Sequence, residues 1–287
     1  MAPAGHDLIP TDPMPLQLKK VEPARGARWL GDAFALFARR PLAFTAMFAV
    51  FLFAALAVSL LPLVGGVLQM MSLPLLSLGF MVASQSALFG GPVTPAQFIE
   101  PLRADPARRR SLLLLCLIYG LAAIAILVIC DWVSGGAMQR LQELMAQGTV
   151  DQAELDALMA EPGVTAAAML ALVLGSLLSV PFWHAPALVH WGRQSVAQSL
   201  FSSTLAVWRC KGAFFVYGLA WFVVATVFGI AAALVFSVLG AHSAASMLAL
   251  PAGLLFSTVF YVSLLFTFND SFGGAQGQAA DGEPPAA

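Results

Sequence analysis

Six long runs of apolar residues dominate the chain, and shorter stretches that mix apolar with charged residues separate them. Each run holds about 20 residues or more, the length that an α-helix needs to cross the hydrocarbon of a bilayer. The pattern therefore predicts an all-α, polytopic membrane helical bundle with six transmembrane helices. The expected spans are residues 41–63, 67–89, 112–133, 164–191, 212–240 and 245–268.

Residues 24–40, ahead of the first span, have a different pattern. Apolar side chains recur there at helical spacing, with Trp29, Phe34 and Phe37 on one face, and arginines lie on or beside the other face. This pattern is typical of an amphipathic helix in the membrane interface, with aromatic side chains inserted and arginines at the headgroups. The alternative is a simple cytosolic extension of the first span.

The two polar loops contain signals for short helices. Thr94 and Gln97 match a capping box, and Asp105 followed by Pro106 marks a second helix start. Within residues 134–163, apolar side chains at helical spacing predict two short amphipathic helices on the outer face of the membrane.

The two ends of the chain lack helical periodicity. The membrane domain that we predict between them covers residues 24–270. Residues 1–23 are rich in proline, and residues 271–287 are rich in glycine and alanine. We expect a disordered cytoplasmic leader and a disordered cytoplasmic tail. The leader does not resemble a cleavable signal peptide, because the first apolar run begins beyond position 40 and is long enough to stay in the bilayer.

Composition narrows the class of protein. Of the 287 residues, 60% are hydrophobic and 10% are charged, against about 45–50% and about 25% in ordinary soluble domains. So little charge cannot keep a soluble protein of this size dispersed. The net charge of −1 gives no electrostatic reason to expect a nucleic-acid partner.

The basic residues are distributed unevenly between the two sides of the predicted spans. Six lysines and arginines precede the first span, four lie between the second and third, and three lie between the fourth and fifth. Of the 14 in the chain, Arg140 alone falls on the opposite side, together with five carboxylates. Because basic loops stay in the cytoplasm, this distribution predicts a bacterial inner-membrane protein with both termini cytoplasmic and residues 134–163 periplasmic.

A short motif recurs before the first, third and fifth spans. It reads FARRPLAF at residues 37–44, ARRRSLLL at 107–114 and WRCKGAFF at 208–215. In each copy a helix runs into basic residues, and an apolar span starts within a few positions. The expected interfacial anchors are Trp29, Arg39, Arg40, Arg108, Arg109, Arg110, Arg209 and Lys211.

Each span that returns across the membrane contains proline, and together with the recurring motif this predicts three repeated helical hairpins. Any six-span protein that obeys the positive-inside rule would have basic residues before its odd-numbered spans, with no repeat. Proline in all three even-numbered spans goes beyond what that rule explains. The candidate structural or gating residues are Pro74, Pro181, His184, Pro186 and Pro251.

Several of these motifs resemble those of a known family. FARRPLAF, Leu-Pro within the second span, APALVHWG at the end of the fourth and WRCKGAFF are similar to a family of uncharacterised six-span bacterial inner-membrane proteins. More distantly, they resemble the membrane domain of some bacterial glycerophosphodiester phosphodiesterases. The resemblance covers residues 25–270 through short, degenerate motifs. It implies an inner-membrane location and brings no catalytic residue with it.

His184 and His190 are the first candidates for chemistry. They are six residues apart, about 240° around a helix, so they do not share a face unless the prolines distort it. No carboxylate or cysteine lies near enough to complete a metal set, so we expect neither a metal nor another cofactor. Next to tryptophans, His190 also fits an interfacial belt.

Pro181 and Pro186 indicate a structural role for the histidine between them. Each proline removes a backbone hydrogen bond and leaves a carbonyl that needs another partner in lipid. We expect His184, Ser176 and Ser179 to supply or support these partners. The fourth span should face protein rather than lipid at this point.

No nucleophile motif, phosphate-binding glycine loop or paired carboxylate is present, so we expect no enzyme. A non-catalytic envelope component or scaffold is the preferred function, with the lipid bilayer and other membrane proteins or a homo-oligomer as partners. The alternative is an uncoupled transporter of a small or hydrophobic solute or lipid, since prolines in corresponding spans point to a midplane binding site. The predicted spans hold no charged residue in the hydrocarbon region, which disfavours ion coupling.

Overall fold

The structure is a computed structural model that describes residues 16–62, 64–103, 105–146, 152–238 and 245–273. These ranges contain helices and no strand. The elements in chain order are α1 (Arg25–Arg39), α2 (Pro41–Ser59), α3 (Gly65–Leu88), η1 (Pro95–Phe98), η2 (Glu100–Arg103), α4 (Pro106–Val133), α5 (Ala137–Ala146), α6 (Gln152–Met159), α7 (Pro162–Phe182), α8 (Ala185–His190), α9 (Val196–Arg209), α10 (Lys211–Val238) and α11 (Ala245–Phe272).

The predicted six-span bundle is confirmed. Among the described residues, six helical segments are long and apolar enough to cross a membrane, and the fourth consists of α7 and α8 together. Proline occupies the first turn of α2, η1, α4 and α7, where its missing N–H costs no intrahelical bond. The Gln97 side chain accepts from the backbone N–H of Thr94 over 3.0 Å, as the predicted capping box requires.

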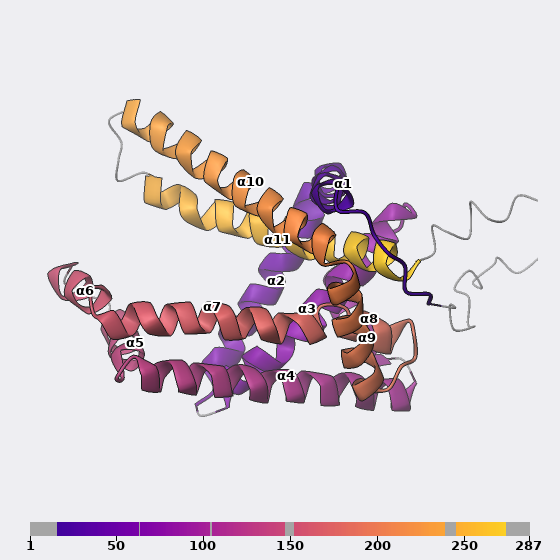
Figure 1. Cartoon of the computed structure of the whole chain (residues 1–287), viewed down its shortest axis with the longest axis horizontal. Coiled ribbons are helices and arrows are strands. Elements are labelled where there is room, and N and C mark those ends of the chain that lie inside the picture. Colours follow the sequence, from indigo (N-terminus) through magenta and orange to yellow (C-terminus); the bar gives the residue numbers. More distant parts are fainter. Residues whose placement is uncertain (1–15, 63, 104, 147–151, 239–244, 274–287) are drawn as a thin grey trace, which may run out of the picture.

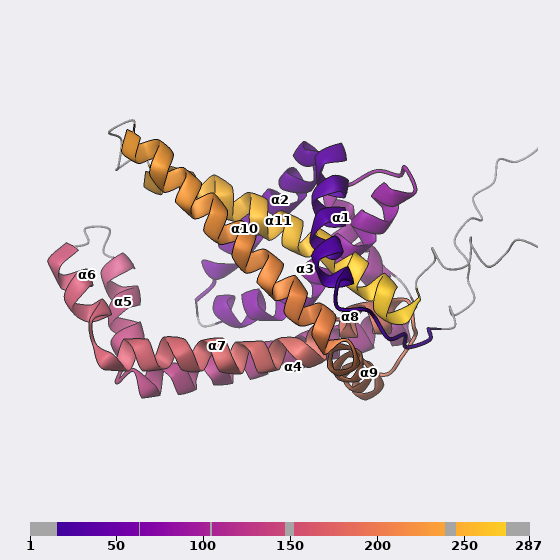
Figure 2. The same ribbon diagram turned by 45° about the horizontal axis from the view of Figure 1, so that its top comes forward.

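The helices gather at one end of the bundle and diverge toward the other. We call the end at which α2, α4 and α10 begin the basic end, and the opposite end, which carries α5 and α6, the distal end. Figures 1 and 2 both show the pair α4–α7 separating from the pair α10–α11 toward the distal end. The two short helices predicted in the polar loop are therefore present as α5 and α6, with residues 147–151 outside the described part.

The three predicted hairpins do not pack alike. The helices α4 and α7 lie antiparallel along most of their length, whereas α11 packs chiefly on α1 and α3 and touches α10 along a shorter stretch. The third pair is thus wedged open by α1, the helix that precedes the first span.

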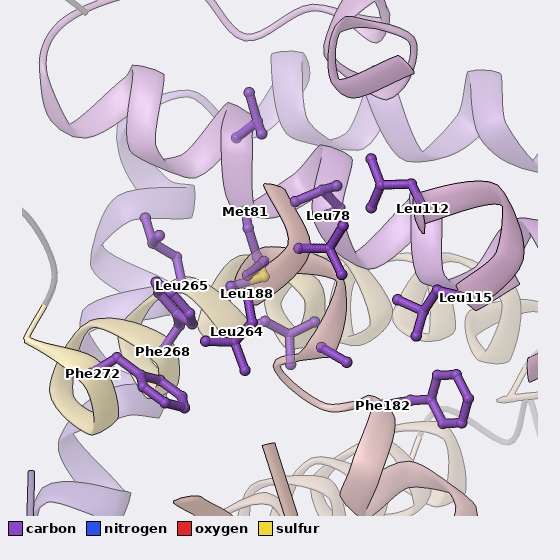
Figure 3. Packing of buried hydrophobic residues seen from close by; sticks show 14 of the residues in the cluster. Leu78, Met81, Leu112, Leu115, Phe182, Leu188, Leu264, Leu265, Phe268 and Phe272 are labelled. Atoms are coloured by element: carbon purple, nitrogen blue, oxygen red, sulfur yellow. The ribbon is translucent and has the colours of Figure 1, made fainter. Parts of the chain in front are cut away.

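The main hydrophobic core lies around α8, near the basic end. Figure 3 shows Leu188 of α8 beside Met81 of α3 and Leu264 of α11. Leu112 and Leu115 from the first turns of α4 belong to the same cluster, and all five of these side chains are buried. A second core joins α1, α2, α3 and α11. These two cores contain side chains from all three predicted hairpins, so the hairpins pack together.

Residues 16–24 correct the prediction of a fully disordered leader. The backbone N–H of Lys19 donates to the carbonyl of Ser271 over 2.9 Å, and Cys210 Sγ lies 3.5 Å from the carbonyl oxygen of Lys19. Leu16, Leu18 and Val21 pack against the helices. This segment is therefore held along the basic end by backbone bonds and apolar contacts, which its proline-rich composition does not reveal. Residues 1–15 and 274–287 lie outside the described part.

Candidate functional site

The helix α1 packs on protein through its apolar face. Trp29 is fully buried, with its ring centroid 5.3 Å from that of Phe214 and 5.9 Å from that of Tyr217, both on α10. Leu30, Ala33, Leu36 and Phe37 are buried on the same face. The expectation that Trp29 anchors the chain in lipid is therefore wrong, because α10 and α11 cover the face that periodicity assigned to the membrane.

Asp270 fixes α1 to the last turn of α11. Its carboxylate accepts from Arg25 Nε over 2.7 Å, from an Arg25 terminal nitrogen over 3.1 Å, and from Trp29 Nε1 over 2.6 Å. Two parallel bonds to a guanidinium are the strong form of a charge-assisted pair. The hydrogen bond that Arg25 donates to Asp270 raises the pKa of Arg25. We call this group of three side chains the α1 clamp.

The fourth span is interrupted at Trp183 and His184, between α7 and α8. The backbone N–H of His184 donates to Ser203 Oγ over 3.0 Å, and Ser203 Oγ donates to the carbonyl of Val180 over 3.1 Å. A single hydroxyl on α9 thus satisfies one donor and one acceptor that the break exposes, as backbone groups in lipid require.

Ser176 and Ser179 do not serve the break, which corrects the prediction. Their hydroxyls donate to carbonyls of their own helix, to Leu172 over 2.6 Å and to the carbonyl of Ser176 over 2.8 Å. The helix α7 turns these serines outward, whereas α8 is buried almost throughout. Span four therefore faces protein from Phe182 onward, which includes Pro186 as predicted, whereas Pro181 is half-buried at the end of α7.

His184 is fully buried and binds α11. Its Nε2 lies 3.2 Å from Thr267 Oγ1, which also accepts from Trp183 Nε1 over 3.2 Å. Because the Thr267 hydroxyl donates to the carbonyl of Leu264, it accepts from His184, and the imidazole carries its proton on Nε2. His184 Nδ1 has no hydrogen-bond partner within the described chain. The rings around the imidazole are those of Phe214, Phe268 and Phe272.

This arrangement joins three helices and offers little for a reaction. Phenyl rings surround the imidazole, and within the described residues no three His, Cys, Asp or Glu side chains gather as a metal set. His190, at the end of α8, packs its ring on Trp191 with centroids 5.7 Å apart. The two histidines are not brought together into one site.

The candidate prolines occupy unequal environments. Pro74 is buried within α3, and its carbonyl accepts from Ser77 Oγ over 2.8 Å, whereas Pro251 is exposed on α11. Pro181 and Pro186 flank the interruption already described. The prolines at corresponding positions in the sequence therefore differ in burial.

The expected basic anchors divide into four groups. Arg40 donates to the carbonyls of Gly90 and Gly91 and so closes the end of α3. Lys211 lies 5.1 Å above the ring of Trp208, a cation–π contact. Arg108 is half-buried. The remaining anchors are exposed, and they are Arg39, Arg109, Arg110 and Arg209.

Sequence reasoning missed the residues that bind the helices to one another, namely Asp270, Ser203 and Thr267. A signal was present in α11, where Ser263, Thr267 and Ser271 recur every four residues inside an apolar run and are all buried. Ser263 Oγ lies 2.6 Å from the hydroxyl of Tyr217 on α10. Hydroxyls at this spacing in a span indicate a face that bonds other helices.

Comparison with known proteins identifies the class of protein but assigns no chemical activity. No family model matches the chain, and no solved structure matches it. The comparisons therefore do not support the distant resemblance to the membrane domain of glycerophosphodiester phosphodiesterases. Over 259 residues the chain is 31% identical to a probable inner membrane protein of Burkholderia thailandensis, covering 90% of this chain and 94% of that protein. The chain therefore belongs to the same family of inner-membrane proteins as this Burkholderia protein.

Proposed function

We propose that the protein is a non-catalytic component of the inner membrane that scaffolds other membrane helices. The observation that carries this proposal is the use of the buried polar side chains. His184, Thr267 and Ser203 hydrogen-bond one helix to another, and the α1 clamp does the same between α1 and α11. Groups committed to such bonds hold a bundle closed and are poorly placed to turn over a substrate.

The long outward face of α10 is the surface that we assign to a partner helix. Within this 28-residue helix, Ala213 and Tyr217 are buried, and both lie in the first two turns at the basic end. The side chains beyond them that are exposed and apolar include Phe222, Val227, Ile230, Leu234 and Val238. Apolar contacts between helices compete with lipid on equal terms, so shape and close packing must select the partner.

The alternative function, an uncoupled transporter, rests on the interrupted fourth span. Unwound backbone between half-helices is a common way to build a midplane binding site. Here Pro181 and Pro186 bracket such a break, but His184 is sealed inside the core and Ser176 is turned outward. These two observations favour the scaffold.

Cysteine accessibility at the break separates the two functions. In a background without Cys116, Cys130 and Cys210, we expect a cysteine at His184 or at the equally buried Ser203 to resist an impermeant thiol reagent from both sides. A cysteine at exposed Arg109 provides the positive control. Labelling of the break from both sides, altered by Pro186→Ala, would show a moving gate and contradict the scaffold.

We also propose that both termini lie in the cytoplasm, because the basic residues gather at one end of the spans. A phosphatase fused after Ala287 should be inactive, whereas one fused after Gln147 should be active in the periplasm. The reverse pattern of activity would invert the orientation.

A further inference from the structure

A cavity of about 360 Å³ opens at the basic end, between the first turns of α4 and the link from α8 to α9. Liquid water occupies about 30 Å³ per molecule, so the cavity has room for a phosphate group with a small substituent. It is lined by Asp105, Ala107, Arg108, Ser111, Val189, Arg193, Gln194 and Ser195.

Two arginines converge on this cavity from different elements. Arg108 comes from α4, and Arg193 comes from the link before α9. Arg108 Nε is shielded from solvent and has no hydrogen-bond partner within the described chain. A guanidinium nitrogen in that position is costly unless an acceptor occupies the space in front of it. Planar guanidinium groups bind phosphate with paired hydrogen bonds.

Backbone donors reinforce the positive potential of the cavity. The helix α4 starts there at Pro106, and the Asp105 side chain makes no capping bond, so the N–H groups of Ala107 and Arg108 have no partner within the helix. The helix α9 also starts beside the cavity, at Val196, and the hydroxyl of its N-cap Ser195 already accepts from the backbone N–H of Gln198. Helix N-termini carry partial positive charge and favour anions.

Gln194 adds an acceptor beside the donors. Its Oε1 is also buried and has no partner within the described part of the chain. A ligand that carries a hydroxyl next to a phosphate would satisfy both this oxygen and the guanidinium. The exposed carboxylate of Asp105 is the group on the wall that opposes an anion.

The neighbouring arginines on α4 differ from the cavity arginines in position. Arg109 and Arg110 follow directly after Arg108 and do not line the cavity, although they are exposed, as Arg193 also is. Arg193 has φ +50°, a left-handed conformation that is uncommon for a residue with a side chain other than Asn, Asp or Gly. The backbone is thus held in an unusual shape at the point where this side chain reaches the wall.

We propose that this cavity binds a phosphate group bearing a hydroxyl, either in the headgroup of an anionic phospholipid or as a soluble phosphate. Arg108 and Arg193 pair with the phosphate oxygens, the free amides at the start of α4 donate to the same group, and Gln194 accepts from the hydroxyl. The site lies just before the apolar run of α4 that begins at Leu112, which is the depth of a headgroup.

The test uses the full chain, purified and reconstituted in two kinds of bilayer. Native mass spectrometry counts phosphatidylglycerol retained from nanodiscs of equal parts phosphatidylcholine and phosphatidylglycerol. Titration calorimetry measures inorganic phosphate binding in nanodiscs of phosphatidylcholine alone. The cavity variants are Arg108→Gln and Arg193→Asn, the latter because asparagine tolerates the left-handed backbone. The matched controls are Arg109→Gln and Arg110→Gln.

We expect each cavity variant to weaken binding about tenfold, the loss of one charge-assisted hydrogen bond, while the controls change it little. Ser111→Leu should weaken binding as well, because it fills the cavity and keeps both charges. Retention of phosphatidylglycerol without phosphate binding identifies a lipid headgroup, and phosphate binding without retention identifies a soluble ligand. Equal losses in cavity and control variants, or no binding of either probe, would overturn the proposal and leave these arginines as interfacial charges.

Discussion

The basic end and the distal end of this bundle are built from the same helices and held in different ways. At the basic end α3, α4, α10 and α11 bury their side chains, and polar bonds connect α1, α8, α9 and α11. Toward the distal end the same spans become exposed, and the pairs α4–α7 and α10–α11 separate (Figure 1).

This difference follows from the solvent. Lipid is as apolar as leucine, so two apolar helix faces gain little by leaving it, and helices associate where small residues or hydrogen bonds favour contact. The basic end has both, in Gly26 against α10 and in the bonds around His184. The distal end has long apolar faces that either lipid or another protein can cover.

The largest effect is expected where α1 and α10 approach most closely. A Cβ added at Gly26 would overlap the carbonyl oxygen of Ala213 and lie 2.8 Å from the backbone nitrogen of Tyr217. Gly26→Ala should therefore lower the free energy of unfolding by about 3 kcal/mol. Gly31→Ala on the same helix meets nothing within 4 Å and should stabilise slightly. Equal thermal stability of the two variants in mild detergent would refute this close packing.

The second-largest loss of unfolding free energy is expected at the α1 clamp. Asp270→Ala leaves Arg25 and Trp29 Nε1 without their acceptor, and we expect it to cost about 2 kcal/mol of unfolding free energy. Asp32→Ala, which removes a longer and more exposed pair at 3.8 Å, should cost less than about 0.5 kcal/mol. Equilibrium unfolding in mixed micelles measures the loss of free energy in both variants. A large loss in Asp32→Ala would show that Asp32, and not Asp270, holds α1 in place.

The interrupted span gives a smaller effect. Ser203→Ala removes the hydroxyl that bonds His184 N–H and the carbonyl of Val180, and we expect a loss of about 1 kcal/mol. The matched control is Thr204→Ala, because Thr204 is exposed and bonds only within its own helix, to Leu200. If both variants unfold alike, another group satisfies the break.

The smallest effect belongs to the distal part of α10. Val227 is 60% exposed there, so Val227→Ala should change the free energy of unfolding by no more than about 0.5 kcal/mol. A change that small, measured in detergent, would show that the Val227 side chain does not stabilise the protein in the absence of a partner. A loss as large as that at Asp270 would mean that the distal helices are packed together.

The sequence was sufficient for the spans because length and apolar composition alone determine them. The start of α4 at Pro106 and the short helices of the polar loop likewise follow from local signals. The environment of Trp29 could not be predicted, because an apolar face has the same periodicity whether lipid or protein covers it. Asp270 escaped notice because it lies beyond the predicted end of the sixth span, and its partners are more than 200 positions away.

The break in span four was predicted in place and misread in detail. Two prolines leave carbonyls without their helical partners, but the prolines do not determine which hydroxyl will bond to those carbonyls. The serines nearest in sequence donate to carbonyls of their own helix instead. Ser203 serves instead because α9 folds back against α7 and α8. That placement depends on packing around α8, which no local pattern encodes.

The central claim, that the outward face of α10 receives another membrane protein, is tested most directly by photocrosslinking in living cells. A photoreactive amino acid at Val227 should give a discrete adduct between this chain and a second polypeptide. The same residue at Leu121, 56% exposed on α4, should give lipid adducts. Lipid adducts alone at both positions would contradict the scaffold and leave α10 as a helix that only the bilayer covers.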